Sequence, residues 1–427
     1  MKAPKVQPVH RAGDVVVVKS GFIPVLILTI SFCRILTGQD LPVNELQVNF
    51  SGYFDSFNVN VLYPNISLTT RVSESTSINA RYLVDMITAA SIRGSSNKSG
   101  VSENDERGFD DKISPTSRTT ATKKVDAVTA ASSSGGRFEQ PSFDDVRNEF
   151  NLGVTHLFAG NRISVNGIYS RESDYSSKTI AGTISRNFAL KNTMIELGYV
   201  HSWDLVFPVT KGWTRTKNVV TYSANFSQLL GKNALIQFLS SYMEYSGYLA
   251  DAYQQISIGP PDNPTPYDPV HPDKRIRRAL GSEFKFRVSQ SSSVQIGYRY
   301  YWDSWEIRSH TISTNYMTYL SPHVIFDLGL RHYLQSRAYF FKPEYTQPED
   351  LMTADIKLEE GYSNEVQLGL TLSGGRDQDY LPFLTDENVQ YNLALNIYQR
   401  HTLTGYWFNG EKNLIATDFN IGIRYRF

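Results

Sequence analysis

Apolar and polar residues alternate along most of this chain, and a period of two limits the folds available to it. From Phe419 to Phe427 every odd position is apolar or aromatic, and polar residues or glycine stand between them. Such alternation places the two sets on opposite faces of a β-strand. The pattern therefore predicts sheets with one apolar and one polar face.

The same alternation recurs upstream, in pairs of segments joined by short turns. Residues 280–288 and 294–301 alternate in this way, and only the polar stretch Ser289–Ser293 separates them. Two alternating runs with a short polar connection predict a β-hairpin. Further short turn signals lie at residues 159–161, 190–192, 231–233 and 321–323.

Composition narrows the class of protein. The chain has 26 tyrosines, 23 phenylalanines and 5 tryptophans, yet its mean hydropathy is −0.33 and only 20% of its residues are charged. A disordered chain would be poor in aromatic residues. The 42 basic residues are matched by 42 acidic ones. Because basic residues are not in excess, the composition does not indicate a nucleic-acid partner, and we expect none.

The N-terminal segment has the pattern of a secretory signal. Lys2, Lys5, Arg11 and Lys19 precede an uncharged run over residues 21–33, and polar residues follow by Gln39. A basic start and a short apolar run predict a signal peptide over residues 1–38, with an uncleaved anchor as the alternative. Its removal would also remove the single cysteine and leave a net charge of −4. A chain without thiols is compatible with an oxidising compartment.

No apolar run near 18 residues follows this segment, so any crossing of a membrane must be made by strands. Long polar connections alternate with the tight turns, and one of them holds six prolines between Pro260 and Pro272. Short turns at one end and long loops at the other are typical of an outer-membrane barrel. We expect long extracellular loops at residues 89–142, 248–277 and 337–359.

The sequence thus predicts an all-β protein in which residues 39–427 form a single domain, a transmembrane antiparallel up-and-down β-barrel. We expect 16 strands, with 14 as the fallback because residues 373–413 should hold a short turn but look long. The expected strands cover residues 45–55, 57–71, 77–88, 143–158, 162–174, 177–189, 193–204, 216–230, 233–247, 278–289, 293–303, 305–320, 324–336, 360–372, 388–400 and 414–427.

Aromatic residues near the ends of these runs fit an interfacial girdle, where amphipathic rings lie at the level of the lipid headgroups. The candidates are Tyr53, Phe158, Trp203, Trp302 and Trp305. The alternative is ordinary packing in the core of a β-sandwich.

Many charged residues fall on the polar phase of the predicted strands. On the lipid face an arginine or lysine would cost about 2–4 kcal/mol at the membrane midplane, so we expect these side chains in the lumen. They are Arg147, Glu149, Arg162, Glu172, Asp174, Glu196, Glu283, Lys285, Arg287, Arg299, Asp327, Arg331, Arg424 and Arg426. Their mixed signs predict either a salt-bridged, filled interior or a weakly selective aqueous path.

Motifs for catalysis or cofactors are sparse. The eight histidines lie far apart, and no nucleophile-elbow, Walker A or dinucleotide fingerprint is present. We therefore predict no catalytic residues, no cofactor and no firm metal site. Asp105, Asp110 and Asp111 lie in an acidic stretch and are weak calcium candidates, but their spacing does not match an EF-hand loop.

Several strings together resemble a bacterial outer-membrane barrel family catalogued as domain of unknown function 3570. A pattern V-D-x-[IV]-T-A-A-S occurs at residues 84–91 and again at 125–132, and the other strings cover residues 169–175, 298–307, 331–341 and 425–427. The chain departs from the family at Ile92 and Ser133, where a proline is expected after Ala-Ser. The resemblance implies an integral outer-membrane location and brings no established activity.

These patterns favour a porin-like channel or conduit, or a barrel scaffold for a periplasmic or surface protein partner. Outer-membrane lipid and the barrel-insertion machinery are the other expected partners. Insertion machinery recognises an aromatic C-terminal strand, here the apolar set Phe419, Ile421, Ile423, Tyr425 and Phe427. The alternatives are an outer-membrane enzyme acting on lipid or envelope sugars, and a secreted β-sandwich binding protein.

Overall fold

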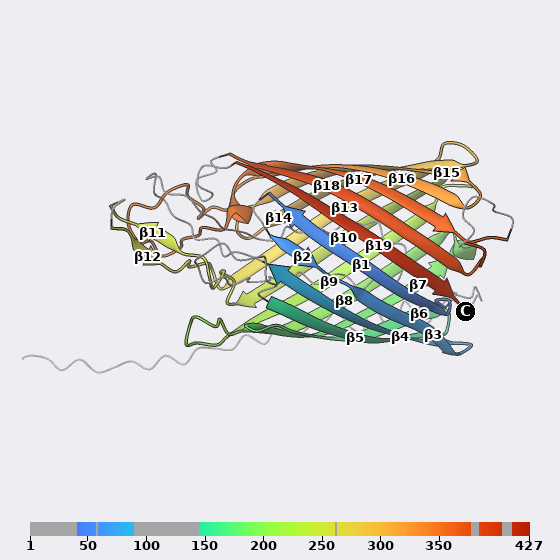
Figure 1. Cartoon of the computed structure of the whole chain (residues 1–427), viewed down its shortest axis with the longest axis horizontal. Helices are drawn as coiled ribbons and strands as arrows, with labels where there is room; N and C mark the ends of the chain where they lie inside the picture. The colour runs from blue at the N-terminus through green and yellow to red at the C-terminus, as the bar shows by residue number, and fades with distance from the viewer. Residues whose placement is uncertain (1–40, 57–58, 89–144, 261–262, 377–383, 404–411) are drawn as a thin grey trace, which may run out of the picture. The chain divides into compact units, whose positions relative to one another are not determined.

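Sixteen antiparallel strands close into one barrel, so the predicted fold class and strand count are confirmed (Figure 1). The computed structural model describes residues 41–56, 59–88, 145–260, 263–376, 384–403 and 412–427. Each strand pairs with its neighbour along the chain, and β19 (Asn413–Arg426) pairs with β1 (Glu45–Asp55) to close the ring. The barrel has no edge strand, because every strand pairs with a neighbour on both sides. The sandwich alternative is therefore wrong.

The second strand consists of two segments, β2 (Asn60–Leu62) and β3 (Asn65–Ser73), where the sequence predicted one run over 57–71. Pro64 lies at the break, because proline has no backbone N–H to donate to a ladder. The neighbouring groups are still paired: the N–H of Tyr63 donates to Ser51, and the carbonyl of Pro64 accepts from Val84. The interruption leaves the sheet continuous.

The other strands follow in chain order. Their bounds are β4 (Thr76–Thr88), β5 (Asp145–Phe158), β6 (Asn161–Arg171), β7 (Tyr175–Phe188), β8 (Thr193–Val206), β9 (Arg215–Leu229), β10 (Ala234–Gly247), β13 (Lys274–Arg287), β14 (Ser292–Asp303), β15 (Arg308–Ser321), β16 (Val324–Gln335), β17 (Gly361–Ser373) and β18 (Val389–Thr402). A short 3-10 helix, η1 (Ala189–Lys191), joins β7 to β8. No helix in the described part of the chain is long and apolar enough to span a membrane.

The barrel has two unlike ends. Short connections such as 159–160, 230–233 and 322–323 lie at one end, here called the turn end, together with the start of β1 and the end of β19. The connection between β17 and β18 is longer than its neighbours, as the sequence indicated. The long segments 248–273 and 336–360 meet at the opposite end, the loop end, where β11 (Ile256–Ile258) and β12 (Thr265–Tyr267) pair (Figure 1).

The outward face of the barrel is apolar. Outward positions include Phe50, Leu152, Ile312, Leu330 and Ile421, all of them exposed. In a soluble protein a continuous exposed apolar surface on this scale would not persist in water. The alternation therefore presents one face that requires lipid and another that encloses the lumen.

Two of the five predicted girdle residues are placed differently. Phe158 and Trp203 are exposed on the outward face, and Trp302 shares the outward phase of β14. Tyr53 instead faces the lumen, where its hydroxyl donates to Asp55. Trp305 precedes β15, which begins at Arg308 rather than at the predicted residue 305, and is buried under the loops. The girdle prediction was wrong for these two rings because run ends alone do not fix facing or strand boundaries.

The register can be tested with adjacent residues at the middle of β17. Leu368→Arg places a guanidinium on the outward face and should lower the free energy of unfolding by about 2–4 kcal/mol. Gln367→Arg places the same group in the lumen and should change it much less. Denaturant titration of the barrel in lipid vesicles measures both, and equal losses would contradict the assignment of the faces.

Candidate functional site in the barrel lumen

Small or uncharged polar side chains line much of the wall in the turn-side part of the lumen. Inward positions here alternate with the apolar outward ones, and many of them are only partly buried. They include Asn49, Ser67, Asn79, Ser164, Asn166, Thr183, Ser223, Asn225, Ser313, Asn315, Gln367, Thr371, Asn392 and Asn420. Such a wall is hydrophilic, and inward charged residues lie among these positions, including Glu45, Arg162, Glu196, Lys285, Arg287, Asp327, Arg424 and Arg426.

Inward glycines let neighbouring side chains of this wall lie close to the backbone. At Gly153 a Cβ would overlap the side-chain oxygens of Asn79 and Asn166, and at Gly198 it would overlap the hydroxyl of Ser223. Without a Cβ at these positions, the neighbouring side chains lie back across the glycines. Asn79 donates to Asn166 across the strands, at 3.3 Å. These amides therefore hydrogen-bond along the wall.

The loop-side part of the lumen carries paired charges. Arg147 pairs with Asp85 and lies 3.7 Å from Glu172, and Lys217 lies 3.5 Å from Asp204. The guanidinium of Arg275 donates two hydrogen bonds to Asp303, at 2.8 and 2.6 Å. Pairs of this kind satisfy buried charges that would otherwise be costly to desolvate.

Aromatic rings cover several of these cations. The guanidinium carbon of Arg275 lies 4.2 Å from the ring centre of Trp305, and that of Arg277 lies 4.6 Å from Tyr245. The ammonium of Lys217 lies 5.5 Å from Tyr175. These distances fall within the range of cation–π attraction. Rings and ion pairs together give this part of the lumen an amphipathic lining.

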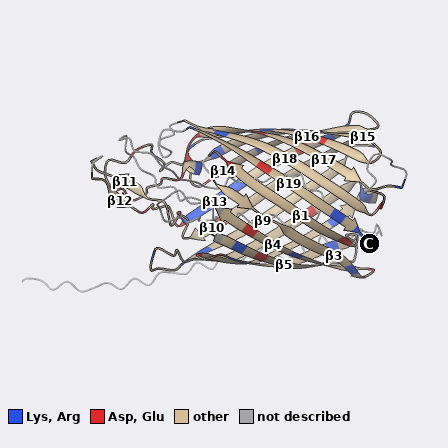
Figure 2. Cartoon of the chain, in the orientation of Figure 1, with Lys and Arg blue, Asp and Glu red and all other residues tan. Residues whose placement is uncertain are grey.

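A cavity of about 360 Å³ lies within this loop-side lining. Barrel strands contribute Arg81, Arg299 and Arg400, and the loops contribute Asp251 and His271. The inward charges belong to strands all around the barrel, and Figure 2 shows basic and acidic positions recurring along them. The candidate site is thus built jointly by the wall and by the loops.

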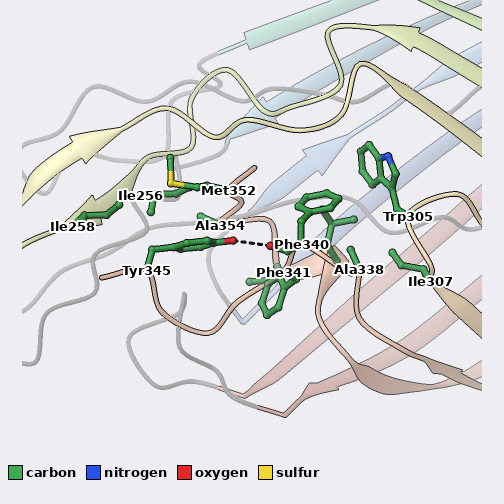
Figure 3. Close-up of a cluster of buried hydrophobic side chains, with 12 residues drawn as sticks. Ile256, Ile258, Trp305, Ile307, Ala338, Phe340, Phe341, Tyr345, Met352 and Ala354 are labelled. Carbon is green, nitrogen blue, oxygen red and sulfur yellow. Dashed lines mark hydrogen bonds between the residues drawn. The ribbon is translucent and has the colours of Figure 1, made fainter. Parts of the chain in front are cut away.

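The loops that reach this cavity form a cap with its own hydrophobic core (Figure 3). Segments 248–273 and 336–360 are joined by a bridge between Val270 and Met352. The hydroxyl of Tyr345 donates to the carbonyl of Phe340 at 2.9 Å. The core comprises Ile256, Ile258, Trp305, Ile307, Ala338, Phe340, Phe341, Tyr345, Met352, Ala354, Ile356 and Leu358. The last residues of that core belong to η2 (Ile356–Leu358), which lines the cavity.

His271 joins the two segments of the cap. Its Nδ1 lies 3.1 Å from the carbonyl oxygen of Leu249, and its Nε2 lies 2.8 Å from the hydroxyl of Thr353. The ring also contacts Trp305 and Phe340, each at 5.4 Å between ring centres. A neutral ring satisfies both hydrogen bonds if Nδ1 donates and Nε2 accepts.

The charge state of His271 follows from its burial. Loss of solvent lowers the pKa of His271 to about 4, although Asp355 acts in the opposite direction. Burial also raises the pKa of Asp251, whose carboxyl lies in the same cap. Burial in the folded cap therefore disfavours the charged form of both groups.

The structure gathers some of the predicted lumen residues in the loop-side part. Arg147 pairs with Asp85 and lies near Glu172, Glu149 pairs with Arg81, and the carboxylate of Asp174 accepts from Tyr253 of the cap. Glu172 and Asp174 lie beyond the end of β6, not on a strand as predicted. A tight turn in which the N–H of Glu172 donates to Tyr175 aims both carboxylates inward.

Of the remaining candidates, Arg299 and Arg331 also line the loop-side cavity, and the others lie elsewhere in the barrel. Glu283 accepts from Gln295, Asp327 accepts from Asn315, and Arg331 pairs with Glu365 at 3.2 Å. Arg424 and Arg426 both pair with Glu45 near the turn end. Arg162, Glu196, Lys285, Arg287 and Arg299 share the inward phase of their strands.

The sequence did not single out His271, Trp305 or Phe340 as parts of a site. The proline-rich loop marked only an irregular segment, and nothing in the spacing of these residues shows that they meet. The calcium candidates Asp105, Asp110 and Asp111 lie outside the described residues. Within the described ranges, no cluster of histidine, cysteine and acidic side chains has the arrangement of a metal site.

Comparisons with known proteins agree on a family. A family model described as "Protein of unknown function (DUF3570)" matches residues 37–214 and 209–422. A search of curated proteins found no match.

Several solved structures resemble the chain at low identity. A bacterial polysaccharide outer membrane secretin is 8% identical over 91% of this chain and 100% of that chain, with a TM-score of 0.47. A loop L8 deletion mutant of OmpT, an outer membrane protein of Vibrio cholerae, is 8% identical over 90% of this chain and 99% of that chain, with a TM-score of 0.42. The siderophore receptor PirA from Pseudomonas aeruginosa is 10% identical over 90% of this chain, which spans 64% of that receptor, with a TM-score of 0.39.

The cap should loosen in acid. In an opened cap His271 would regain a pKa near 6.5, whereas in the folded cap its pKa is about 4. Between these values only the opened state takes up the proton, so the stability of the cap falls as the pH drops from 6.5 to 4. The opening constant of segment 248–273, obtained from hydrogen exchange after correction for the pH dependence of the intrinsic exchange rate, should be up to roughly 50-fold larger at pH 4.5 than at pH 7.5.

His271→Gln removes the titrating group and should flatten this dependence in the same pH range. Asp251, whose raised pKa favours the folded cap in acid, acts in the opposite sense, so Asp251→Asn should steepen it. An unchanged pH profile in His271→Gln would assign the effect to another group.

Proposed function

We propose that this chain, which belongs to the family of unknown function DUF3570, is an integral outer-membrane channel that passes small polar solutes. Its apolar outward face supports a membrane location, and the connection lengths support the orientation, with the loop end outside and the turn end in the periplasm. Outer-membrane lipid and the insertion machinery would be its partners in the envelope. The outward set Phe419, Ile421, Ile423 and Tyr425 of β19 is the part such machinery would contact.

One observation carries the proposal: much of the turn-side wall consists of uncharged polar side chains, and the inward glycines Gly153 and Gly198 leave space that such side chains lie across. A protein that used its barrel only as a scaffold would gain stability by filling this space with larger side chains. A barrel of 16 strands is also wide enough to leave an aqueous path unless loops or side chains close it.

The loop-side lining supports a class of solute. Its charges are largely paired across strands, as in Arg275 with Asp303 and Arg331 with Glu365, so they present little net field to an ion. Tyrosines and Trp305 add flat apolar surfaces beside polar groups. Small neutral solutes with several hydroxyl groups fit this lining better than ions of either sign.

The cap controls access in this proposal. Its core lies over the loop end, and its segments line the cavity through Asp251, His271 and η2. Passage therefore requires either a narrow route through the cavity or displacement of the cap. The expected behaviour is a small basal conductance that increases when the cap is destabilised.

Single-channel recording of the refolded protein in planar bilayers tests this function. Phe340 is 5% exposed in the cap core, and Phe340→Ala should destabilise the cap by about 3–5 kcal/mol. The reason is the loss of ring contacts with Trp305 and His271. The variant should show a larger or more often open conductance than the parent protein.

Tyr339→Ala is the matched control, because Tyr339 is 52% exposed and should change the conductance little. A folded barrel that stays electrically silent in all three proteins would contradict the channel. A scaffold or an enzyme acting on envelope lipids or sugars would then be the better explanation.

A further inference from the structure

Charges on the outward face of the barrel are few, and they are distributed unevenly. Among the described strand residues, Glu244 is the one acidic residue at an outward position, and Lys274 pairs with it. The outward basic residues lie mainly near the loop end, at Arg171, Lys178, Lys274, Arg278 and Arg308, and Arg186 lies near the turn end. The outward face is therefore cationic where it approaches the loops.

Several of these cations, among them Lys178 and Arg171, have no acidic partner in the described ranges. Lys178 is exposed and makes no hydrogen bond or ion pair with any residue that the structure describes. The guanidinium of Arg171 stacks over Phe207 at 4.6 Å and likewise has no acidic partner in the described ranges. A cation at the lipid boundary without a protein partner is stabilised when it meets an anionic headgroup.

The strand register sets Lys178 among aromatic rings. Lys178 lies opposite Tyr169 on β6 and opposite Trp203 on β8, and Tyr169 lies opposite Phe150 on β5. All of these positions point outward, and Trp203 is the fourth residue from the loop end of its strand. Tyr169, Lys178 and Trp203 lie within four residues of the loop ends of their strands, and aromatic and basic side chains there are typical of the level of the lipid headgroups.

An apolar groove of about 840 Å³ runs alongside this row on the outward surface. Its floor is the neighbouring row, in which Leu68, Ala80, Leu152, Gly167 and Ile180 are paired across five strands. Gly167 and Ala80 are small, and a Cβ at Gly167 would meet nothing within 4 Å. The aromatic row forms one wall above this floor.

The groove crosses from one end of the barrel towards the other. It begins beside Trp203 near the loop end of β8 and reaches Leu46 at the turn end of β1. Six neighbouring strand pairs separate these residues, which corresponds to roughly 30 Å along the sheet. Because barrel strands are tilted, this path runs obliquely to the bilayer normal, and its first part, beside Trp203, lies nearest the loop end.

We propose that Lys178 and Arg171 bind the headgroup phosphate of an acylated glycolipid of the lipid A type, and that the groove holds one of its acyl chains. The charge complementarity favours an anionic headgroup, because this sector of the outward face, β4 to β9, contains no acidic residue in its described strands. The choice of membrane leaflet depends on the orientation given in the proposed function, on which this inference rests. The loop end then meets the outer leaflet, where phosphorylated glycolipid is the bulk lipid.

Native mass spectrometry of the refolded barrel in detergent tests the site, with lipid A bearing two phosphates as the probe. The parent protein should retain one lipid more tightly than the double variant Lys178→Gln/Arg171→Gln, by about tenfold in apparent affinity. Arg308→Gln removes an outward cation at the same end but in another sector, and should leave retention unchanged. Gly167→Leu fills the groove without a backbone clash and should weaken retention while both cations remain.

Each arm has an outcome that contradicts the site. Equal retention by the parent and the double variant, or an equal loss in Arg308→Gln, would show only nonspecific lipid around the barrel. Tighter binding of phosphatidylglycerol than of lipid A would assign the groove to an inner-leaflet lipid and overturn the proposal. Conductance of the same preparations separates the two claims: a conducting barrel without lipid discrimination contradicts this site alone, and a silent barrel that discriminates contradicts the channel alone.

Discussion

Closure of the hydrogen-bonded ladder is the constraint on which the rest of this structure depends. A bilayer offers no water to the backbone, so a sheet can lie in it only if every N–H and C=O is paired within the protein. The pairing of β1 with β19, over eleven residues of register, removes the last edge. Even the break at Pro64 keeps this rule, because the groups beside it find partners on β1 and β4. Closure in turn creates an inside, and with it a site.

The two faces that closure creates are governed by different costs. On the outside, a charge at the midplane is expensive, and the described outward cations lie towards the ends of their strands. On the inside, charges are permitted where a partner is available, as in the pairs Arg147–Asp85 and Arg275–Asp303. At inward positions without charge, asparagine and serine keep the wall polar, and glycines let the neighbouring side chains lie close to the backbone. The lumen therefore has paired charges and aromatic rings under the loops and, towards the turns, uncharged polar side chains interspersed with further inward charges.

The cap shows how loops without regular structure can still be specific. Its two segments would each expose apolar residues alone, but together they bury Phe340, Met352 and Ile356 around Trp305. His271 is buried in its neutral form and hydrogen-bonds both Leu249 and Thr353. Because the cap and the barrel wall line the same cavity, a change in the stability of the cap would also change access to the lumen.

The sequence by itself determined the barrel. A period of two is a local property, so the strands, their facing and the tight turns at residues 159–160 and 322–323 could be predicted from neighbouring residues, and the family resemblance of the same strings is confirmed. Tertiary structure alone decided the cap, the inward turn of Glu172 and Asp174, and the burial of Trp305, because these depend on residues that meet across distant loops. The groove beside Lys178 is of the same kind, since Ala80 and Gly167 are unremarkable in the chain and become its floor only when the register sets them in one row.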